Sequence, residues 1–287
     1  MPKSPPVELN FLHTCFKWMC IMDIQAGMEN EPLNLRIDAG VATLTIDTPA
    51  RRNALTYAMW LEVAALFQVL EADPTVRVVV LRGAGSDFSA GADISEFDTL
   101  RGAPDSARTY EAANSAAFAA VRLARIPVIA AIRGICFGGG FGLAAAADLR
   151  IATPDATFSV PAARLGLAYP LDAMVDIVGS LGEQMAKYLT FTAARLDAAS
   201  AKSAGFLLEV VETEHFDARV DEIARTIAAN APLSIKASKA SMRATATGDK
   251  RDVAFAQQIG DATFASADYA EGRTAFKERR QPVFSGR

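Results

Sequence analysis

One stretch constrains this chain more than any other. The apolar run Val128–Ile132 is broken at Gly134 and is followed by three consecutive glycines, Gly138, Gly139 and Gly140. Glycine weakens helices and strands because its backbone loses the most entropy on being fixed, so three in a row indicate close approach of another group to the backbone. A strand, a glycine turn and an Ala-rich helix also leave free N–H groups at a positive helix end, which can hold an anion or an oxyanion. Close packing of a small-residue helix on a sheet explains the pattern equally well.

Composition excludes several classes of function. The 287 residues are enough for one large domain, or for a domain with a smaller appendage. A net charge of −4 argues against a nucleic-acid partner. The three cysteines are too scattered for a disulfide framework, which favours a cytoplasmic location. The two histidines, His13 and His215, have no metal-ligand spacing and cannot readily build a catalytic triad. We therefore predict no metal site.

Residues 1–31 differ in pattern from the rest of the chain. Their apolar segment is too short and too interrupted by polar groups for a membrane span, and no secretory cleavage site follows it. We interpret residues 1–31 as a poorly ordered N-terminal extension without catalytic function. The alternatives are a short docking helix, or a start codon upstream of a true start at Met22 or Met28.

Residues 32–215 are predicted to form an α/β core. Period-two alternation on both sides of Ala39-Gly40 predicts a hairpin of residues 33–38 and 41–47, and Thr56 is a candidate cap for a helix that ends near residue 71. Further strands are expected at 76–82, 128–132, 148–152, 157–160 and 207–212. Further helices are expected at 105–123, 172–180, 183–191 and 198–204.

Residues 216–287 are predicted to be entirely helical, with helices at 216–230, 233–246, 251–265 and 268–280. In the core, two Gly/Ala-rich loops, at 83–94 and 133–140, follow successive buried strands. Ligands bind where such loops gather at strand ends. We therefore expect the binding site at these two loops.

The same two loops carry a resemblance to a known family. Ser89-Ala90-Gly91-Ala92-Asp93-Ile94, followed about forty residues later by Gly134-Ile135-Cys136-Phe137-Gly138-Gly139-Gly140, resembles the crotonase (enoyl-CoA hydratase/isomerase) superfamily. Supporting segments lie at 52–55, 147–152, 191–205 and 271–276, so the resemblance covers about residues 33–284. It implies an α/β fold, a crotonase-like spiral of ββα units, with a C-terminal all-helical trimerisation region. It also implies a homotrimer or hexamer.

The resemblance assigns roles to particular residues. The backbone N–H groups of Ala92 and Gly139 would hold the carbonyl oxygen of an acyl-CoA thioester and stabilise the charge of its enolate. The coenzyme A moiety, the only cofactor implied, would lie along Arg52, Ala54, Ala90, Gly91, Asp93 and Ile94. Arg51 could neutralise a phosphate. Lys277, with Arg279 and Arg280, forms a second basic cluster that could reach the nucleotide, although a solvated helix end accounts for it equally well.

The chain departs from the family pattern at the two glutamates that a hydratase needs. Gly142 stands at the first position, and Ala162 stands at the second, directly after Pro161. General acid–base catalysis requires a titratable group within hydrogen-bond reach. Neither glycine nor alanine provides one, so ordinary hydration of an enoyl-CoA is chemically unsupported.

Several other residues could supply a proton. Asp172 lies ten residues after Ala162, near the position of a catalytic aspartate in dienoyl-CoA isomerases; otherwise it caps the following helix. Tyr169 could donate a proton or could simply pack. Glu96, Asp98 and Glu111 are weaker candidates, in a region that would form a wall of the acyl pocket. Cys136 is better explained as a small buried residue that fills space in the core. Arg164 could pair with a substrate carboxylate or with Asp172.

Three functions therefore remain open at the level of sequence. The chain could be an enzyme of fatty-acid metabolism that forms an acyl-CoA enolate, such as an isomerase, a decarboxylase or a C–C hydrolase. It could be a non-catalytic acyl-CoA binding or carrier protein, which both vacant glutamate positions favour. It could also be a hydratase with displaced carboxylates, because a family does not fix chemistry.

Overall fold

The computed structural model describes residues 31–287, so the predicted N-terminal extension lies almost wholly outside the described residues. The main sheet has the strand order β1-β2-β3-β4-β6-β9. Its strands are β1 (Leu33–Asp38), β2 (Val41–Ile46), β3 (Val78–Gly83), β4 (Val128–Ile132), β6 (Leu149–Ala152) and β9 (Glu209–Val210). Only β1 is antiparallel to its neighbour. The parallel strands therefore deliver their carboxyl ends to one edge of the sheet.

The predicted β1–β2 hairpin is confirmed. Leu33 pairs with Ile46 and Asp38 pairs with Val41, and the two turn residues, Ala39 and Gly40, have φ angles of 47° and 82°. A two-residue turn with both central φ angles positive matches the right-handed twist of the flanking strands. The alternating sequence and the turn thus specify the same register.

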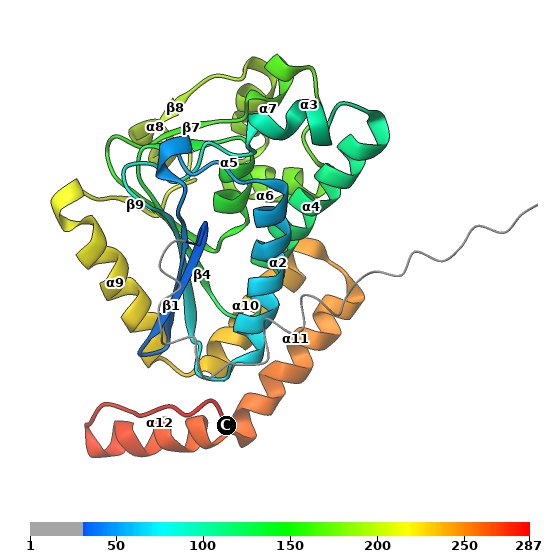
Figure 1. The fold of residues 1–287 in the computed structure, drawn as a ribbon. Helices are drawn as coiled ribbons and strands as arrows, with labels where there is room; N and C mark the ends of the chain where they lie inside the picture. Colours follow the sequence, from blue (N-terminus) through cyan, green and yellow to red (C-terminus); the bar gives the residue numbers. More distant parts are fainter. Residues whose placement is uncertain (1–30) are drawn as a thin grey trace, which may run out of the picture.

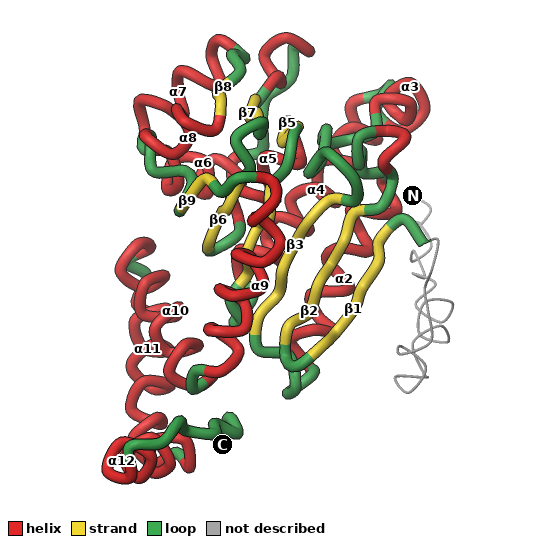
Figure 2. The backbone as a smooth tube through the Cα atoms, turned by 90° about the vertical axis from the view of Figure 1, so that its left-hand side faces the viewer, coloured by secondary structure: helices red, strands yellow, loops and turns green. Residues whose placement is uncertain are grey.

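Helices cover both faces of the main sheet (Figures 1 and 2). On one face lie α2 (Tyr57–Ala72) and α4 (Pro104–Leu123), which bury a large aromatic and aliphatic core. On the other face lies α9 (Thr213–Ala229), whose Phe216, Val220 and Ala224 form a second core with the sheet. The predicted domain boundary at residue 216 therefore falls inside a helix that packs against the core.

A second, smaller sheet lies at the carboxyl edge of the first. It consists of β5 (Ile135–Phe137), β7 (Thr157–Ser159) and β8 (Leu196–Asp197), with β7 in the middle. Of these, only β7 was predicted. Glycines flank the three residues of β5, which is typical of a loop, and the residues around β8 show no alternation. This sheet matters for the site because β5 leads directly into the glycine triplet.

The other predicted helices are confirmed, with ends shifted by a few residues. They are α5 (Gly139–Ala146), α6 (Leu171–Leu181), α7 (Glu183–Thr192), α8 (Ala198–Ser203), α10 (Pro232–Thr247), α11 (Lys250–Ala262) and α12 (Ala267–Glu278). The single-turn helix α3 (Phe97–Leu100) was not predicted. Helices α11 and α12 extend away from the sheet, at the end of the molecule opposite α3 and α7 (Figure 1). Residues 31–287 include no helix long and apolar enough to cross a membrane, and no His, Cys, Asp and Glu group arranged to hold a metal ion.

Candidate functional site

The two predicted loops are joined by backbone hydrogen bonds. Ser89 lies beside β5: its N–H donates to Ile135 O at 2.9 Å, and its carbonyl accepts from Phe137 N at 2.9 Å. Further along the same loop, the Leu55 N–H donates to Gly91 O at 2.8 Å. Residues 89–93 are therefore fixed between the segment before α2 and the strand that leads into α5. Fixed backbone donors cost no reorganisation when a charge develops next to them.

The N–H groups of Ala92 and Gly139 lie next to each other in this arrangement. A Cβ atom built on Gly139 would be 3.7 Å from the Ala92 nitrogen, and one built on Gly91 would be 2.8 Å from the Gly139 nitrogen. Gly139 is the first residue of α5, where the N–H has no acceptor within the helix. Within residues 31–287, neither N–H has a hydrogen-bond acceptor. Two free donors at a helix start can hold one oxygen atom.

The glycines are required by close packing around these two donors. Gly138 has a φ angle of 50°, which favours glycine. A Cβ on Gly139 would lie 2.7 Å from the Trp60 ring, and one on Gly140 would lie 2.6 Å from Ser89 O. The sequence left open whether this stretch packs closely or exposes N–H groups. It does both.

Asn53 anchors the loops, and sequence reasoning did not single out its role. Its side chain is fully buried and donates to Ala84 O at 2.8 Å and to Asp87 O at 2.6 Å. Its own carbonyl accepts from Ser89 Oγ at 2.7 Å. The sequence does contain a signal for a turn here, an asparagine between polar residues and an apolar helix. Asn53 has a φ angle of 55°, in the left-handed region that asparagine adopts more readily than most residues.

Asp93, predicted to contact coenzyme A, makes its contacts within the protein. Its carboxylate lies 2.5 Å from the Arg51 guanidinium and accepts from the Ser95 N–H and hydroxyl at 2.9 and 2.7 Å. Burial alone would raise the pKa of Asp93, but these hydrogen bonds together lower it. The Asp93 side chain therefore shapes the loop and holds Arg51, whose guanidinium is mostly exposed.

The predicted coenzyme A contacts divide into two groups. Arg52, Ala54, Ala90, Gly91, Asp93 and Ile94 are brought together, since Ala90 N donates to Arg52 O and Asp93 N donates to Leu55 O, both at 2.9 Å. Lys277 lies on α12, at the opposite end of the molecule from these loops (Figure 1). The neighbouring Arg280 pairs with Glu271 and Glu278. One chain therefore does not bring the second basic cluster to the site.

Tyr169 and Phe118 occupy the space beside Gly142. A Cβ on Gly142 would lie 2.6 Å from the Tyr169 hydroxyl oxygen and 2.7 Å from the Phe118 ring. The Tyr169 hydroxyl donates to Gly138 O at 2.8 Å, and its ring stacks on Phe118 at 6.4 Å between centroids. Burial raises the pKa of Tyr169. A neutral phenol therefore stands where the resemblance places the first glutamate.

Asp172 does not cap its helix, contrary to the alternative drawn from the sequence. Helix α6 begins at Leu171, so Asp172 lies inside the first turn. Its carboxylate accepts from the Ser115 hydroxyl at 3.1 Å and lies 3.8 Å from the Arg122 guanidinium. The suggested pairing of Asp172 with Arg164 is therefore wrong, and Arg164 is exposed.

The weaker acid candidates are engaged elsewhere. Glu96 accepts from the Tyr57 N–H at 2.7 Å, at the start of α2, and from the Tyr110 hydroxyl at 3.3 Å. Glu111 pairs with Arg101 at 2.9 Å, and burial raises its pKa. Asp98 is exposed. Cys136 is a free, fully buried thiol whose pKa is raised by burial, as expected of a filler.

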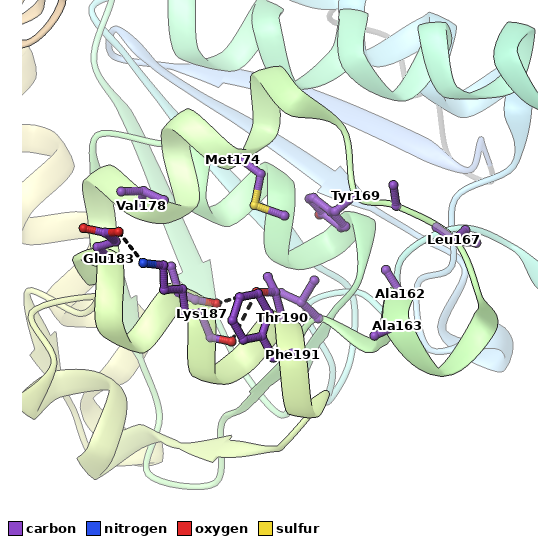
Figure 3. Close-up of a pocket in the computed structure, with 13 residues that line it drawn as sticks. Ala162, Ala163, Leu167, Tyr169, Met174, Val178, Glu183, Lys187, Thr190 and Phe191 are labelled. Atoms are coloured by element: carbon purple, nitrogen blue, oxygen red, sulfur yellow. Dashed lines mark hydrogen bonds and ion pairs between the residues drawn. The ribbon is translucent and has the colours of Figure 1, made fainter.

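An apolar pocket of about 630 Å³ lies next to Tyr169, between α6, α7 and the 3₁₀ segment Pro161–Leu165. In Figure 3, Ala162, Leu167 and Tyr169 stand on one side of it, and Lys187, Thr190 and Phe191 of α7 stand on the other. Ala162, at the second vacant glutamate position, is thus part of the pocket wall. We call this cavity the α6–α7 pocket.

Residues 36–287 match the family model described as enoyl-CoA hydratase/isomerase. The chain is 34% identical over 262 residues to the short-chain-enoyl-CoA hydratase of Clostridium acetobutylicum, covering 88% of this chain and 97% of that protein. It is 33% identical over 262 residues to the crotonyl-CoA hydratase of Syntrophomonas wolfei, covering 90% and 99%.

Solved structures show the same fold. An enoyl-CoA hydratase/isomerase family protein from Hyphomonas neptunium is 36% identical, with a TM-score of 0.85 over 90% of this chain and 98% of that one. The enoyl-CoA hydratase of Bacillus anthracis is 27% identical, with a TM-score of 0.84 over 90% and 100%. The predicted crotonase-like fold is confirmed, and the chain belongs to the enoyl-CoA hydratase/isomerase family.

Proposed function

We propose that this protein binds an acyl-CoA thioester with its carbonyl oxygen between the N–H groups of Ala92 and Gly139, and that these donors stabilise the enolate of that thioester. The observation that carries the proposal is the pair of adjacent, unused backbone donors at the start of α5. One such donor is worth about 3 kcal/mol of transition-state stabilisation in other enzymes. No cofactor beyond the coenzyme A moiety is needed for this step.

The protonation state of Tyr169 limits the reaction type. A phenol whose pKa is raised by burial stays neutral near pH 7, so it can donate a proton but cannot act as a base. Loss of carbon dioxide from a 2-carboxyacyl-CoA breaks the C–C bond and leaves its electron pair as the enolate, so no base is required. Proton transfer from the Tyr169 hydroxyl to the α-carbon, with solvent replacing that proton, would complete the reaction. We therefore favour decarboxylation over hydration.

Two other functions each have an observation in their favour. Asp172, hydrogen-bonded to Ser115 in the turn after Tyr169, could serve as the acid of an isomerase. The absence of a carboxylate at both Gly142 and Ala162 favours a non-catalytic acyl-CoA carrier.

The experiment that tests the carbonyl site is a matched pair of glycine substitutions. Gly91→Ala would place a methyl group 2.8 Å from the Gly139 nitrogen, and this residue has a φ angle of 93°. Gly85→Ala imposes comparable backbone strain, at a φ angle of 69°, but the nearest atom to its methyl group is 3.7 Å away, on Pro49. We expect Gly91→Ala to weaken butyryl-CoA binding about tenfold by calorimetry, the loss of about 1.4 kcal/mol expected for one hydrogen bond to a ground-state carbonyl, while Gly85→Ala binds like the wild type. Equal affinities in both variants would refute the proposal.

Turnover assays then separate the reaction types. A decarboxylase should consume malonyl-CoA or an alkylmalonyl-CoA and leave crotonyl-CoA unchanged. Brisk hydration of crotonyl-CoA would overturn our interpretation of Gly142 and Ala162, and saturable binding without turnover would support the carrier.

We also propose a homotrimeric or hexameric assembly in the cytoplasm. Its support is the exposure of large apolar side chains on α10 to α12, among them Met242, Phe255 and Phe276. In such an assembly, Lys277 of one copy could serve the site of another. Analytical ultracentrifugation of the full chain tests this assembly, and a monomer at micromolar concentration would contradict it.

A further inference from the structure

We propose that Arg77, Arg125 and Lys236 form a binding site for a small phosphate-bearing anion at the amino edge of the main sheet. The site recognises the phosphate groups themselves, as in pyrophosphate. This inference does not depend on the proposed function, because it concerns other residues at the opposite edge of the sheet from the Ala92 and Gly139 donors.

The three cations lie where strands and a helix begin. Arg77 lies directly before β3, Arg125 lies three residues before β4, and Lys236 lies in the second turn of α10. The loops that carry Ala92 and Gly139 follow the other ends of β3 and β4. Since the six residues of β3 span about 20 Å, the cations are well separated from those loops. Helix α10 accordingly lies at the end of the molecule away from α5 (Figure 1).

A hydrogen bond from α10 places Lys236 next to Arg125. Lys239 donates from Nζ to the carbonyl of Ile126 at 3.0 Å, and Lys236 lies one turn earlier on the same helix. Ile126 directly follows Arg125, whose guanidinium Nε lies 3.7 Å from Glu71 Oε1. The Arg125 side chain is 64% exposed, so this side of the cluster is open to solvent.

The C-terminal segment places Arg77 beside the start of α10. A Cβ atom built on Gly286 would lie 3.1 Å from Pro232 Cγ and 3.3 Å from Arg77 Nη1. Pro232 is the first residue of α10, one turn before Lys236. The N-terminus of a helix carries a partial positive charge, so α10 adds to the positive potential of the cations around it.

Positive charge exceeds negative charge in this cluster. Burial, together with the charges of Arg125 and Arg77, lowers the pKa of Lys236, and the charge of Glu71 opposes this shift. In the described part of the chain, neither Arg77 nor Lys236 forms an ion pair. The buried carboxylate of Asp268, near the C-terminus, instead accepts backbone N–H groups. An anion bound between the three cations would remove their mutual repulsion.

Phosphate matches these donors. The arginine guanidinium is a planar fork of N–H groups that pairs with two phosphate oxygens, and the lysine ammonium adds a compact point charge. Because pyrophosphate carries more negative charge than orthophosphate, we expect it to bind more tightly. ADP should bind no more tightly than pyrophosphate, since the cluster itself contains no aromatic ring on which a base would stack.

Calorimetry with sodium pyrophosphate tests the proposal on the full-length protein, at constant ionic strength because salt screens exposed charges. We expect saturable binding that persists when butyryl-CoA is present at saturation, since the two sites lie at opposite edges of the sheet. Absence of pyrophosphate binding, or its displacement by butyryl-CoA, would overturn the proposal. Tighter binding of ADP than of pyrophosphate would refute recognition of the phosphate groups alone.

Charge-removing variants locate the site. Lys236→Met and Arg125→Gln should each weaken pyrophosphate binding about tenfold, the loss expected for one charge-assisted hydrogen bond, and Lys236→Arg should retain it. Lys250→Met removes the same charge at an exposed position of α11 and should bind like the wild type. Without the anion, Lys236→Met should melt at a higher temperature than the wild type, because it relieves repulsion.

The outcomes keep this site apart from the carbonyl site. Undiminished pyrophosphate binding in both Lys236→Met and Arg125→Gln would overturn the anion site. Should Lys236→Met fail to fold, Arg125→Gln decides alone, because its side chain is largely exposed. Failure of butyryl-CoA to bind, with pyrophosphate still bound and sensitive to these two variants, would overturn the proposed function and leave the anion site intact.

Discussion

The hydroxyl oxygen of Tyr169 lies 2.6 Å from the point where a Cβ atom on Gly142 would be. Residue 142 therefore has no room for a side chain while Tyr169 keeps its position. The two residues are 27 apart in the sequence. The Tyr169 side chain can occupy this position only because residue 142 is glycine. The vacant glutamate position is not an open space.

Replacement of Gly142 by alanine should destabilise the protein even though alanine is the better helix former. The new methyl group would overlap both Tyr169 and Phe118, and overpacking of this kind costs about 1–3 kcal/mol. Urea unfolding measures this cost. The matched control is Gly179→Ala in α6, where nothing lies within 4 Å of the new methyl group and about 0.5–1 kcal/mol of stabilisation is expected. Equal stabilisation by the two changes would show that Tyr169 does not occupy the space beside Gly142.

Removal of the Tyr169 hydroxyl should separate binding from turnover. In Tyr169→Phe, we expect the dissociation constant for butyryl-CoA to stay within twofold and kcat for an alkylmalonyl-CoA to fall about 100-fold or more, the usual effect of losing a positioned acid. Tyr188→Phe, on the half-exposed face of α7, is the control and should keep full activity. Unchanged turnover in Tyr169→Phe would exclude the phenol as the proton donor.

Asp172→Asn tests the acid that the sequence suggested. Since the Asp172 carboxylate is held by Ser115 and lies near Arg122, we expect decarboxylation to stay within a factor of about three, a change below 1 kcal/mol in the barrier. Steady-state kinetics on the same alkylmalonyl-CoA measures it. A loss as large as that in Tyr169→Phe would instead make Asp172 the catalytic acid.

Arg150 holds the far end of the helix that carries the Gly139 donor. Its guanidinium donates to Ala147 O at 2.6 Å and to Ala144 O and Ala145 O at 3.3 Å, and so satisfies carbonyl groups at the C-terminus of α5. It also donates to Phe206 O at 2.6 Å. Arg150→Met should lower the free energy of unfolding by about 3 kcal/mol, because charged hydrogen bonds are lost and carbonyls are left unpaired. Urea unfolding is the measurement, with exposed Arg164→Met as the control. A loss no larger than that of the control would contradict this role.

Asp176 gives a pH dependence with a definite sign. Burial raises the pKa of Asp176 to about 6, although its ion pair with Arg122 at 2.5 Å opposes the shift. In the unfolded chain its pKa is about 3.9. Since the folded state binds this proton more tightly than the unfolded state, ionisation of Asp176 lowers the free energy of unfolding. This loss is absent below pH 3.9, grows as pH rises, and is complete above pH 6.

The variant Asp176→Asn isolates this contribution. The free energy of unfolding of Asp176→Asn, relative to that of the wild type, should increase by up to about 3 kcal/mol from pH 4 to pH 7. A constant difference in stability between the two proteins does not affect this increase. Thermal unfolding at several pH values measures the change, with exposed Asp98→Asn as the control. A difference that stays constant with pH would show that Asp176 is not perturbed.

Most elements of this fold could be predicted because their signals are local. The β1–β2 hairpin follows from alternation and from the residues at its turn, and the start of α2 follows from Thr56, whose hydroxyl accepts from Met59 N at 3.3 Å. The strand β5 could not be predicted because Gly134 and Gly138 flank it, which is typical of a loop, and β8 could not be predicted because the residues around it show no alternation. They form only by pairing with β7, which is remote in the sequence.

The candidate site divides in the same way. By itself, the sequence determined the two glycine-rich loops and the absence of glutamate at residues 142 and 162, because these depend on residue identity and spacing. The family resemblance implied the pairing of the Ala92 and Gly139 N–H groups. Only the tertiary structure decided that Tyr169 fills the space beside Gly142, that Asp93 pairs with Arg51, and that Lys277 lies far from the loops. Those facts depend on which side chains, remote from one another in the sequence, lie close together in the folded chain. Tertiary packing decides this, and no periodic pattern in the sequence reports it.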